Sequence, residues 1–179
     1  MGALSDDAVG KFLGDNFEST YQKVGTFRVV SGVKVGGNVV AYFCLSDGTV
    51  IHAVAGPLGA QAFLREARWA VDLRKLAASE AGGDAAKYRA ALRKGHLERL
   101  ASESSLTLPP KTLPAILNGP PPVPTNNQLR TNAGRGLGNQ GQVHALLAYY
   151  PLPKLSQLFT IVFEDVLKEK VSTLPVNTK

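Results

Sequence analysis

Cysteine is almost absent from this sequence, because Cys44 is the only one among 179 residues. A single thiol excludes an internal disulfide, a cysteine-rich zinc site and any CxxC pair within the chain. Dithiol–disulfide exchange would therefore need a second thiol from elsewhere. Cys44 lies in a continuously apolar stretch, so we expect a buried, unreactive thiol with a raised pKa.

Long hydrophobic runs are also lacking. No apolar run approaches the ~20 residues that a membrane-spanning helix needs, and the first residues lack the basic and apolar regions of a signal peptide. We therefore expect no membrane association. Taken as written, the sequence predicts a cytoplasmic chain. It carries no other signal of location, so the location stays unknown.

The three histidines, His52, His96 and His144, are far apart in the sequence and show no HxxxH spacing. On that ground we predict no metal site. No Ser-His-Asp arrangement is recognisable either, so we assign no catalytic, cofactor-binding or metal-binding residue. Gly136 to Gly141 match GxGxxG, but residues 129–133 form a poor strand before them, so a glycine-rich linker is the simpler interpretation.

Basic residues outnumber acidic ones, with 20 Lys and Arg against 14 Asp and Glu. One helical face after residue 84 carries Arg89, Arg93 and His96, with further basic residues nearby at Lys87, Lys94 and Arg99. This face, together with Arg130 and Arg135, would attract phosphates. A solvated basic face is the simpler interpretation, so we do not expect nucleic acid as a partner.

The first half of the chain alternates helix and strand signals. Ser5 opens a helix, residues 26–30 read as a strand, and residues 39–45 as a central strand covered on both faces. The Asp47-Gly48 turn leads into a returning strand over residues 49–55, which ends at Gly56-Pro57.

Two helices follow this hairpin. The apolar and polar stripes of residues 60–77 predict a helix that packs on the sheet, with Trp69 and Leu73 in its packing face. A second helix begins near Asp84 and is weakened by Gly95.

These signals divide the chain into residues 1–104 as an α/β domain with an extra helix, 105–142 as a Pro/Gly/Asn-rich linker, and 143–179 as an amphipathic helical segment. The helix from Lys154 has an apolar stripe that includes Phe159, Val162 and Phe163. We expect this stripe to dock on its own domain, since leaving it exposed would favour aggregation; pairing with a second copy is the alternative.

The block from Asn38 to Gly56, with its Asp-Gly turn and closing glycine, resembles the terminal hairpin of the thioredoxin family, and the resemblance covers residues 1–79. It implies a thioredoxin-like fold truncated at the N-terminus, because Met1 to Val9 would align just after the family's CxxC motif. The family's first strand and thiol pair would then precede Met1. Where the family usually has a cis-proline, this sequence has Gly36, Gly37 and Asn38.

The resemblance favours a thioredoxin-like protein without a dithiol site that serves as a non-catalytic scaffold or protein-interaction module. One alternative is a thiol-disulfide oxidoreductase whose CxxC lies upstream of Met1. Another is a basic nucleic-acid-binding module. As given, the chain carries no evidence of enzymatic activity.

Overall fold

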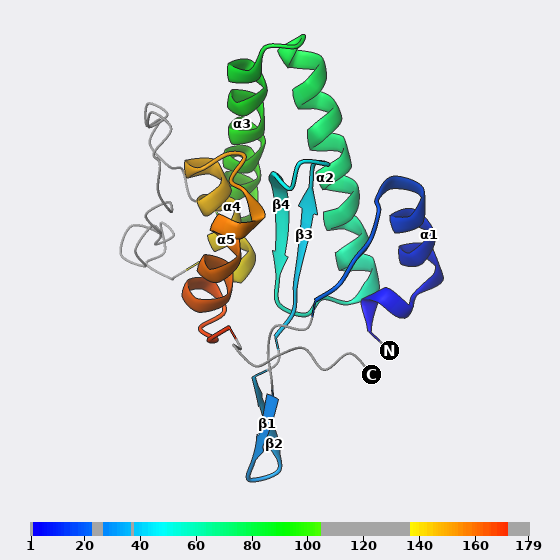
Figure 1. Cartoon of the computed structure of the whole chain (residues 1–179), viewed down its shortest axis with the longest axis vertical. Coiled ribbons are helices and arrows are strands. Elements are labelled where there is room, and N and C mark those ends of the chain that lie inside the picture. Colours follow the sequence, from blue (N-terminus) through cyan, green and yellow to red (C-terminus); the bar gives the residue numbers. More distant parts are fainter. Residues whose placement is uncertain (1, 23–26, 37, 105–136, 172–179) are drawn as a thin grey trace.

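The computed structural model describes residues 2–22, 27–36, 38–104 and 137–171 and shows a mixed α/β fold (Figure 1). A short 3-10 turn, η1 (Ala3–Ser5), leads into helix α1 (Asp7–Asn16). The residue that caps α1 is Asp6 and not Ser5, because the Asp6 carboxylate accepts hydrogen bonds from the amides of Ala8 and Val9.

The expected strand at residues 26–30 is present as β1 (Phe27–Val30), but it lies outside the main sheet. It pairs antiparallel with β2 (Val33–Gly36), a strand that the sequence analysis missed. Ser31 and Gly32 make the tight turn, both with positive φ. In Figure 1 this hairpin projects from one end of the molecule, away from β3 and β4.

The predicted hairpin is confirmed as β3 (Val40–Cys44) and β4 (Val50–Ala55), which pair antiparallel. Gly48 at the turn has a φ of 76°, which a glycine adopts without strain. The expectation of a central strand at residues 39–45 is wrong for the described residues, because β3 pairs there with β4 alone. β4 is the better covered strand, with all six residues buried.

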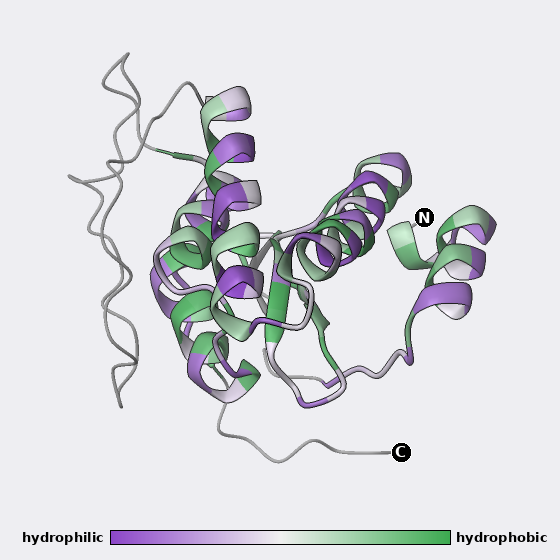
Figure 2. Ribbon diagram, turned by 90° about the horizontal axis from the view of Figure 1, so that it is seen from above, coloured by the Kyte–Doolittle hydropathy of each residue, from purple (hydrophilic) through white to green (hydrophobic). Residues whose placement is uncertain are grey.

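Helices cover both faces of this strand pair (Figure 2). Ile51 and Val54 of β4 pack with α2 (Ala60–Ala81) on one side. Val50, Ala53 and Ala55 pack on the other side with the C-terminal helices. α1 lies beside α2 at the edge of the molecule and buries Val9 completely.

The predicted helix at residues 60–77 is confirmed as α2 and runs four residues further, to a left-handed Gly82. α3 (Ala85–Ser104) packs against it in antiparallel fashion. Gly95 allows this close approach, because a Cβ at this position would overlap the Leu73 side chain. The glycine that weakens α3 as an isolated helix is thus what lets it pack on α2.

The expectation of a linker up to residue 142 is wrong at its end, because helix α4 spans Asn139–Tyr149. The second half of the GxGxxG match belongs to this helix, with Gly138 as its N-cap, while Gly136 lies outside the described residues. The rest of the expected linker, residues 105–136, also lies outside the described residues, together with its Arg130 and Arg135. Residues 172–179 lie outside them as well.

The C-terminal segment docks on its own chain, as expected. α5 (Leu155–Ile161) continues into a π-helical turn, η2 (Val162–Val166), and Val162 and Phe163 are buried against β4 and α4 while Phe159 packs at the edge of the cluster. Lys154 forms an ion pair with Asp47 at the β3–β4 turn. Within the described residues, no helix has the length and apolar character needed to cross a membrane.

Replacing Phe163 by alanine should lower the free energy of unfolding of the whole chain by roughly 3–5 kcal/mol, because the ring is 3% exposed inside the main cluster. Glu164→Ala, in the same turn but exposed, is the control and should change stability by less than about 0.5 kcal/mol. Urea denaturation of both variants measures the difference. Equal midpoints for Phe163→Ala and the parent chain would contradict the docking.

Gly95→Ala should destabilise the protein although alanine favours helix, because the added methyl group meets Leu73. Gly10→Ala is the matched control, since Gly10 lies within α1 with open space around it and should gain roughly 0.5–1 kcal/mol. Thermal melts should therefore shift in opposite directions. A stabilised Gly95→Ala protein would show that α2 and α3 pack less closely.

Candidate functional site

The three histidines that are remote in the sequence meet in the core. His52 comes from β4, His96 from α3 and His144 from α4, and each is at most 1% exposed. One ring nitrogen of each lies within 4.8 Å of one ring nitrogen of each of the others. We call these three residues the histidine cluster.

The hydrogen bonds of the cluster indicate which ring nitrogens carry a hydrogen atom. His52 Nε2 lies 2.9 Å from Glu66 Oε2, and His96 Nε2 lies 2.9 Å from the Ile51 carbonyl oxygen. A carboxylate and a carbonyl only accept, so both Nε2 atoms carry hydrogen and both Nδ1 atoms present lone pairs. His96 Nδ1 then accepts from His144 Nδ1, at 2.9 Å.

Two ring nitrogens remain without a hydrogen-bond partner among the described residues: His52 Nδ1 and His144 Nε2. Both are buried lone pairs under the proton arrangement above. A buried polar atom without a hydrogen-bond partner lowers the free energy of unfolding, and such atoms are uncommon in native cores.

A second layer of polar and aromatic groups surrounds the cluster. Arg99 of α3 binds the Glu66 carboxylate that holds His52. The guanidinium of Arg99 also lies 4.6 Å from the centre of the Trp69 ring. Trp69 meets all three imidazoles edge to face, with ring centroids 4.7–5.1 Å away.

Burial keeps the histidines neutral. It lowers the pKa of His52 and of His144, and it lowers the pKa of His96 to about 3, with the neighbouring His52 adding to the effect. Burial alone would raise the pKa of Glu66, but the hydrogen bond from His52 and the charge of Arg99 hold it below its usual value. The site therefore combines three neutral imidazoles with a charged Glu66–Arg99 pair.

The prediction of no metal site relied on sequence spacing, and that argument does not hold in three dimensions because the fold brings the histidines together. His96 also does not belong to an exposed basic face with Arg89 and Arg93, since its ring is buried. That face of α3 is therefore smaller than the sequence pattern indicates.

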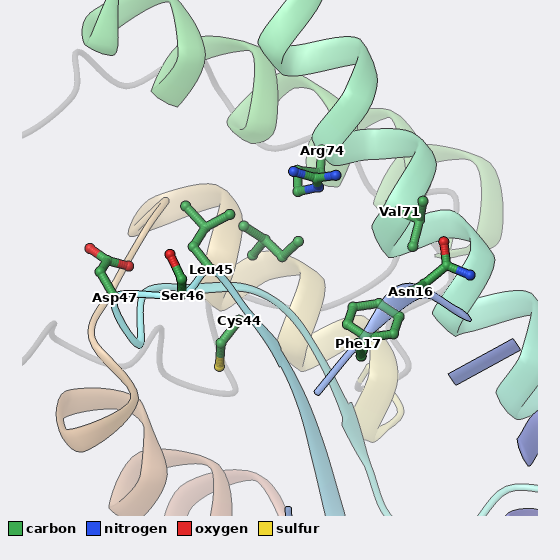
Figure 3. A pocket seen from close by; sticks show the side chains of 9 residues that line it. Asn16, Phe17, Cys44, Leu45, Ser46, Asp47, Val71 and Arg74 are labelled. Atoms are coloured by element: carbon green, nitrogen blue, oxygen red, sulfur yellow. The ribbon is translucent and has the colours of Figure 1, made fainter. Parts of the chain in front are cut away.

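A surface cavity of about 440 Å³ lies where β3 turns into β4 (Figure 3). Its apolar wall is made by Phe17, Leu45, Ile51 and Val71, and Arg74 of α2 and Asn16 contribute polar ends. Cys44, Ser46 and Asp47 complete the lining. We call this cavity the turn pocket.

Cys44 borders the turn pocket but faces away from its apolar wall. Its side chain packs with the cluster on the α4–α5 side, whereas Leu45 packs on the α2 side (Figure 3). The sequence predicted a fully buried thiol, but Cys44 is only half-buried in the structure. Burial, with a contribution from Asp47, raises the pKa of the thiol, as expected.

No protein-family model matches this chain, and neither the curated proteins nor the solved structures contain a match.

Cys44 should react with a thiol reagent much more slowly in the folded protein than in urea at the same pH, because its sulfur is packed and protonated. The control is Ser46→Cys in a Cys44→Ser chain, which places a thiol at an exposed position two residues away and should react quickly in both conditions. Equal folded-state rates for the two thiols would show that Cys44 is accessible.

Proposed function

We propose that this protein is a thioredoxin-like α/β domain that acts by binding a protein partner and not by dithiol exchange. Support comes from the order of α1, β3, β4 and α2 along the chain, which is the order of helix, hairpin and helix on which the resemblance is based. The Asp47-Gly48 turn and Gly56, with a φ of 99°, stand at the expected places. With Cys44 as its one thiol, the chain needs another molecule for any dithiol chemistry.

The turn pocket is the binding surface in this proposal, and its accessibility is the observation that carries it. The histidine cluster lies in the core, and none of its members lines either of the two described pockets. A partner can reach the turn pocket without unfolding the protein, whereas it cannot reach the cluster. The second described pocket is smaller, about 260 Å³.

The lining of the turn pocket defines the ligand chemistry. Its apolar wall accepts one large hydrophobic side chain, and Arg74 offers a cation at the rim. Asp47 does not cancel that cation, because its carboxylate is bonded to Lys154 and Thr49. The occupant that fits is a peptide segment with an apolar side chain next to a carboxylate.

A peptide of this kind, Ac-Leu-Glu-Phe-Glu-Leu-NH2, should bind more tightly than its neutral counterpart with Gln in place of Glu. Arg74→Glu should weaken the acidic peptide at least about tenfold, because attraction at the pocket rim becomes repulsion. Titration followed by NMR amide shifts measures both effects and shows whether the shifts cluster at the pocket.

Arg65→Glu is the matched control, since Arg65 is exposed on the same helix but does not line the pocket. It changes the net charge equally and should leave the affinity close to that of the parent chain. Equal binding of the two peptides, or equal losses in the two variants, would remove the turn pocket as the partner surface.

The purified chain should show no insulin reductase activity above the background of limiting dithiothreitol, because a single packed thiol cannot complete a dithiol cycle. The Cys44→Ser protein is the control. Turnover above background that disappears in Cys44→Ser would establish an intermolecular thiol mechanism and overturn the non-catalytic assignment.

A further inference from the structure

We propose that the histidine cluster is a transition-metal centre in which His52, His96 and His144 bind one ion of the Zn²⁺ class. This inference is independent of the turn pocket and of any protein partner. It rests on the convergence of three buried imidazoles from β4, α3 and α4, described above.

The separations fit a single ion. Ligand nitrogens bound to a tetrahedral zinc ion lie about 3.3 Å apart, and the imidazole ring centres then lie about 5 Å apart. The ring centroids of the cluster are separated by 5.2, 5.2 and 5.8 Å. His96 Nδ1 and His144 Nδ1 are 2.9 Å apart, so a small outward movement of the rings would admit the ion.

The outer nitrogens are held as metal-binding histidines usually are. Metal-bound imidazoles commonly donate their second N–H to a carboxylate or a backbone carbonyl, which fixes the ring and leaves the other nitrogen free to bind. Glu66 has this role for His52, and the Ile51 carbonyl has it for His96. Nδ1 of both residues is thereby assigned as a ligand. His144 binds through the Nδ1 that lies beside His96 Nδ1, in the tautomer that carries its proton on Nε2.

A second observation that supports a metal site is the presence of buried ring nitrogens without hydrogen-bond partners. A purely hydrogen-bonded cluster leaves His52 Nδ1 and His144 Nε2 without partners among the described residues, in a core that excludes the side chains from solvent. An ion bound to His52 Nδ1 removes that orphan, since the lone pair becomes a metal bond. The alternative, an ordered water bridging the rings, is an outcome of the test below.

The donor set selects the class of ion. Three neutral imidazoles suit zinc, cobalt, nickel and copper, whereas calcium and magnesium prefer oxygen ligands. Arg99 pairs with both Glu66 and Glu103, so the charged groups beside the site carry one net negative charge, which favours a cation. The fourth position falls to water or hydroxide, which would also balance part of the charge of the ion.

Titration of metal-free protein with Co²⁺ should give the visible absorption bands of tetrahedral cobalt, saturating at one ion per chain, and Zn²⁺ should displace it. Trp69 is the only tryptophan and touches all three rings, so Co²⁺ should also quench its fluorescence. Zn²⁺ should raise Tm by several degrees, because the ion binds only the folded site.

His144→Asn should abolish the cobalt bands, and Glu66→Gln should lower metal affinity about 10- to 100-fold while leaving the three ligands in place. Leu147→Ala is the matched control: Leu147 is buried on the same helix as His144, so its loss destabilises α4 without removing a ligand. It should still bind one ion. Circular dichroism confirms that each variant is folded.

Two results would overturn the proposal. One is folded parent protein that binds no more Zn²⁺ or Co²⁺ than His144→Asn and whose Tm does not respond to either ion. The other is cobalt binding that survives in His144→Asn, which would place the ion elsewhere. A high-resolution crystal structure with an ordered water at the centre of the cluster in zinc-containing buffer would equally exclude the metal centre.

Discussion

The burial of β4 on both faces is the constraint on which the rest of the structure depends. A strand covered on both sides needs two apolar layers, and α2 supplies only one of them. The C-terminal helices must return across a long connection to supply the other. Doubling the number of residues in a connection costs only ~0.6 kcal/mol in closure entropy, whereas each large side chain buried contributes about 1.5–3 kcal/mol, so docking of this segment is strongly favoured.

Placing a histidine in such a strand has consequences for its neighbours. His52 cannot reach solvent, so the helix above it provides Glu66 as an acceptor, and Arg99 in turn neutralises that buried carboxylate. Trp69 fills the remaining space with an apolar ring whose face receives the guanidinium. One polar residue in β4 thus explains the unusual composition of the α2–α3 interface.

Local patterns predicted most of the elements whose signals are local, with β2 as the exception. The Asp47-Gly48 turn and the apolar stripes located β3, β4, α2 and the final helix correctly. The start of α4 and the histidine cluster were missed, because both are set by contacts between segments far apart in the sequence. Two signals were available: His52 interrupts an otherwise apolar strand, and Glu66 lies off the polar stripe of its helix.

Ile51 connects the two sites of this protein. Its side chain lines the turn pocket, while its backbone carbonyl fixes His96 in the core. Because β4 is paired with β3 and covered by helices on both faces, Ile51 cannot shift without disturbing the ring that it holds. The rigid strand between them gives the pocket a preformed wall and holds the backbone positions of His52 and of the carbonyl that bonds His96. The packing that stabilises the fold therefore also restrains the turn pocket and the histidine cluster through one residue of β4.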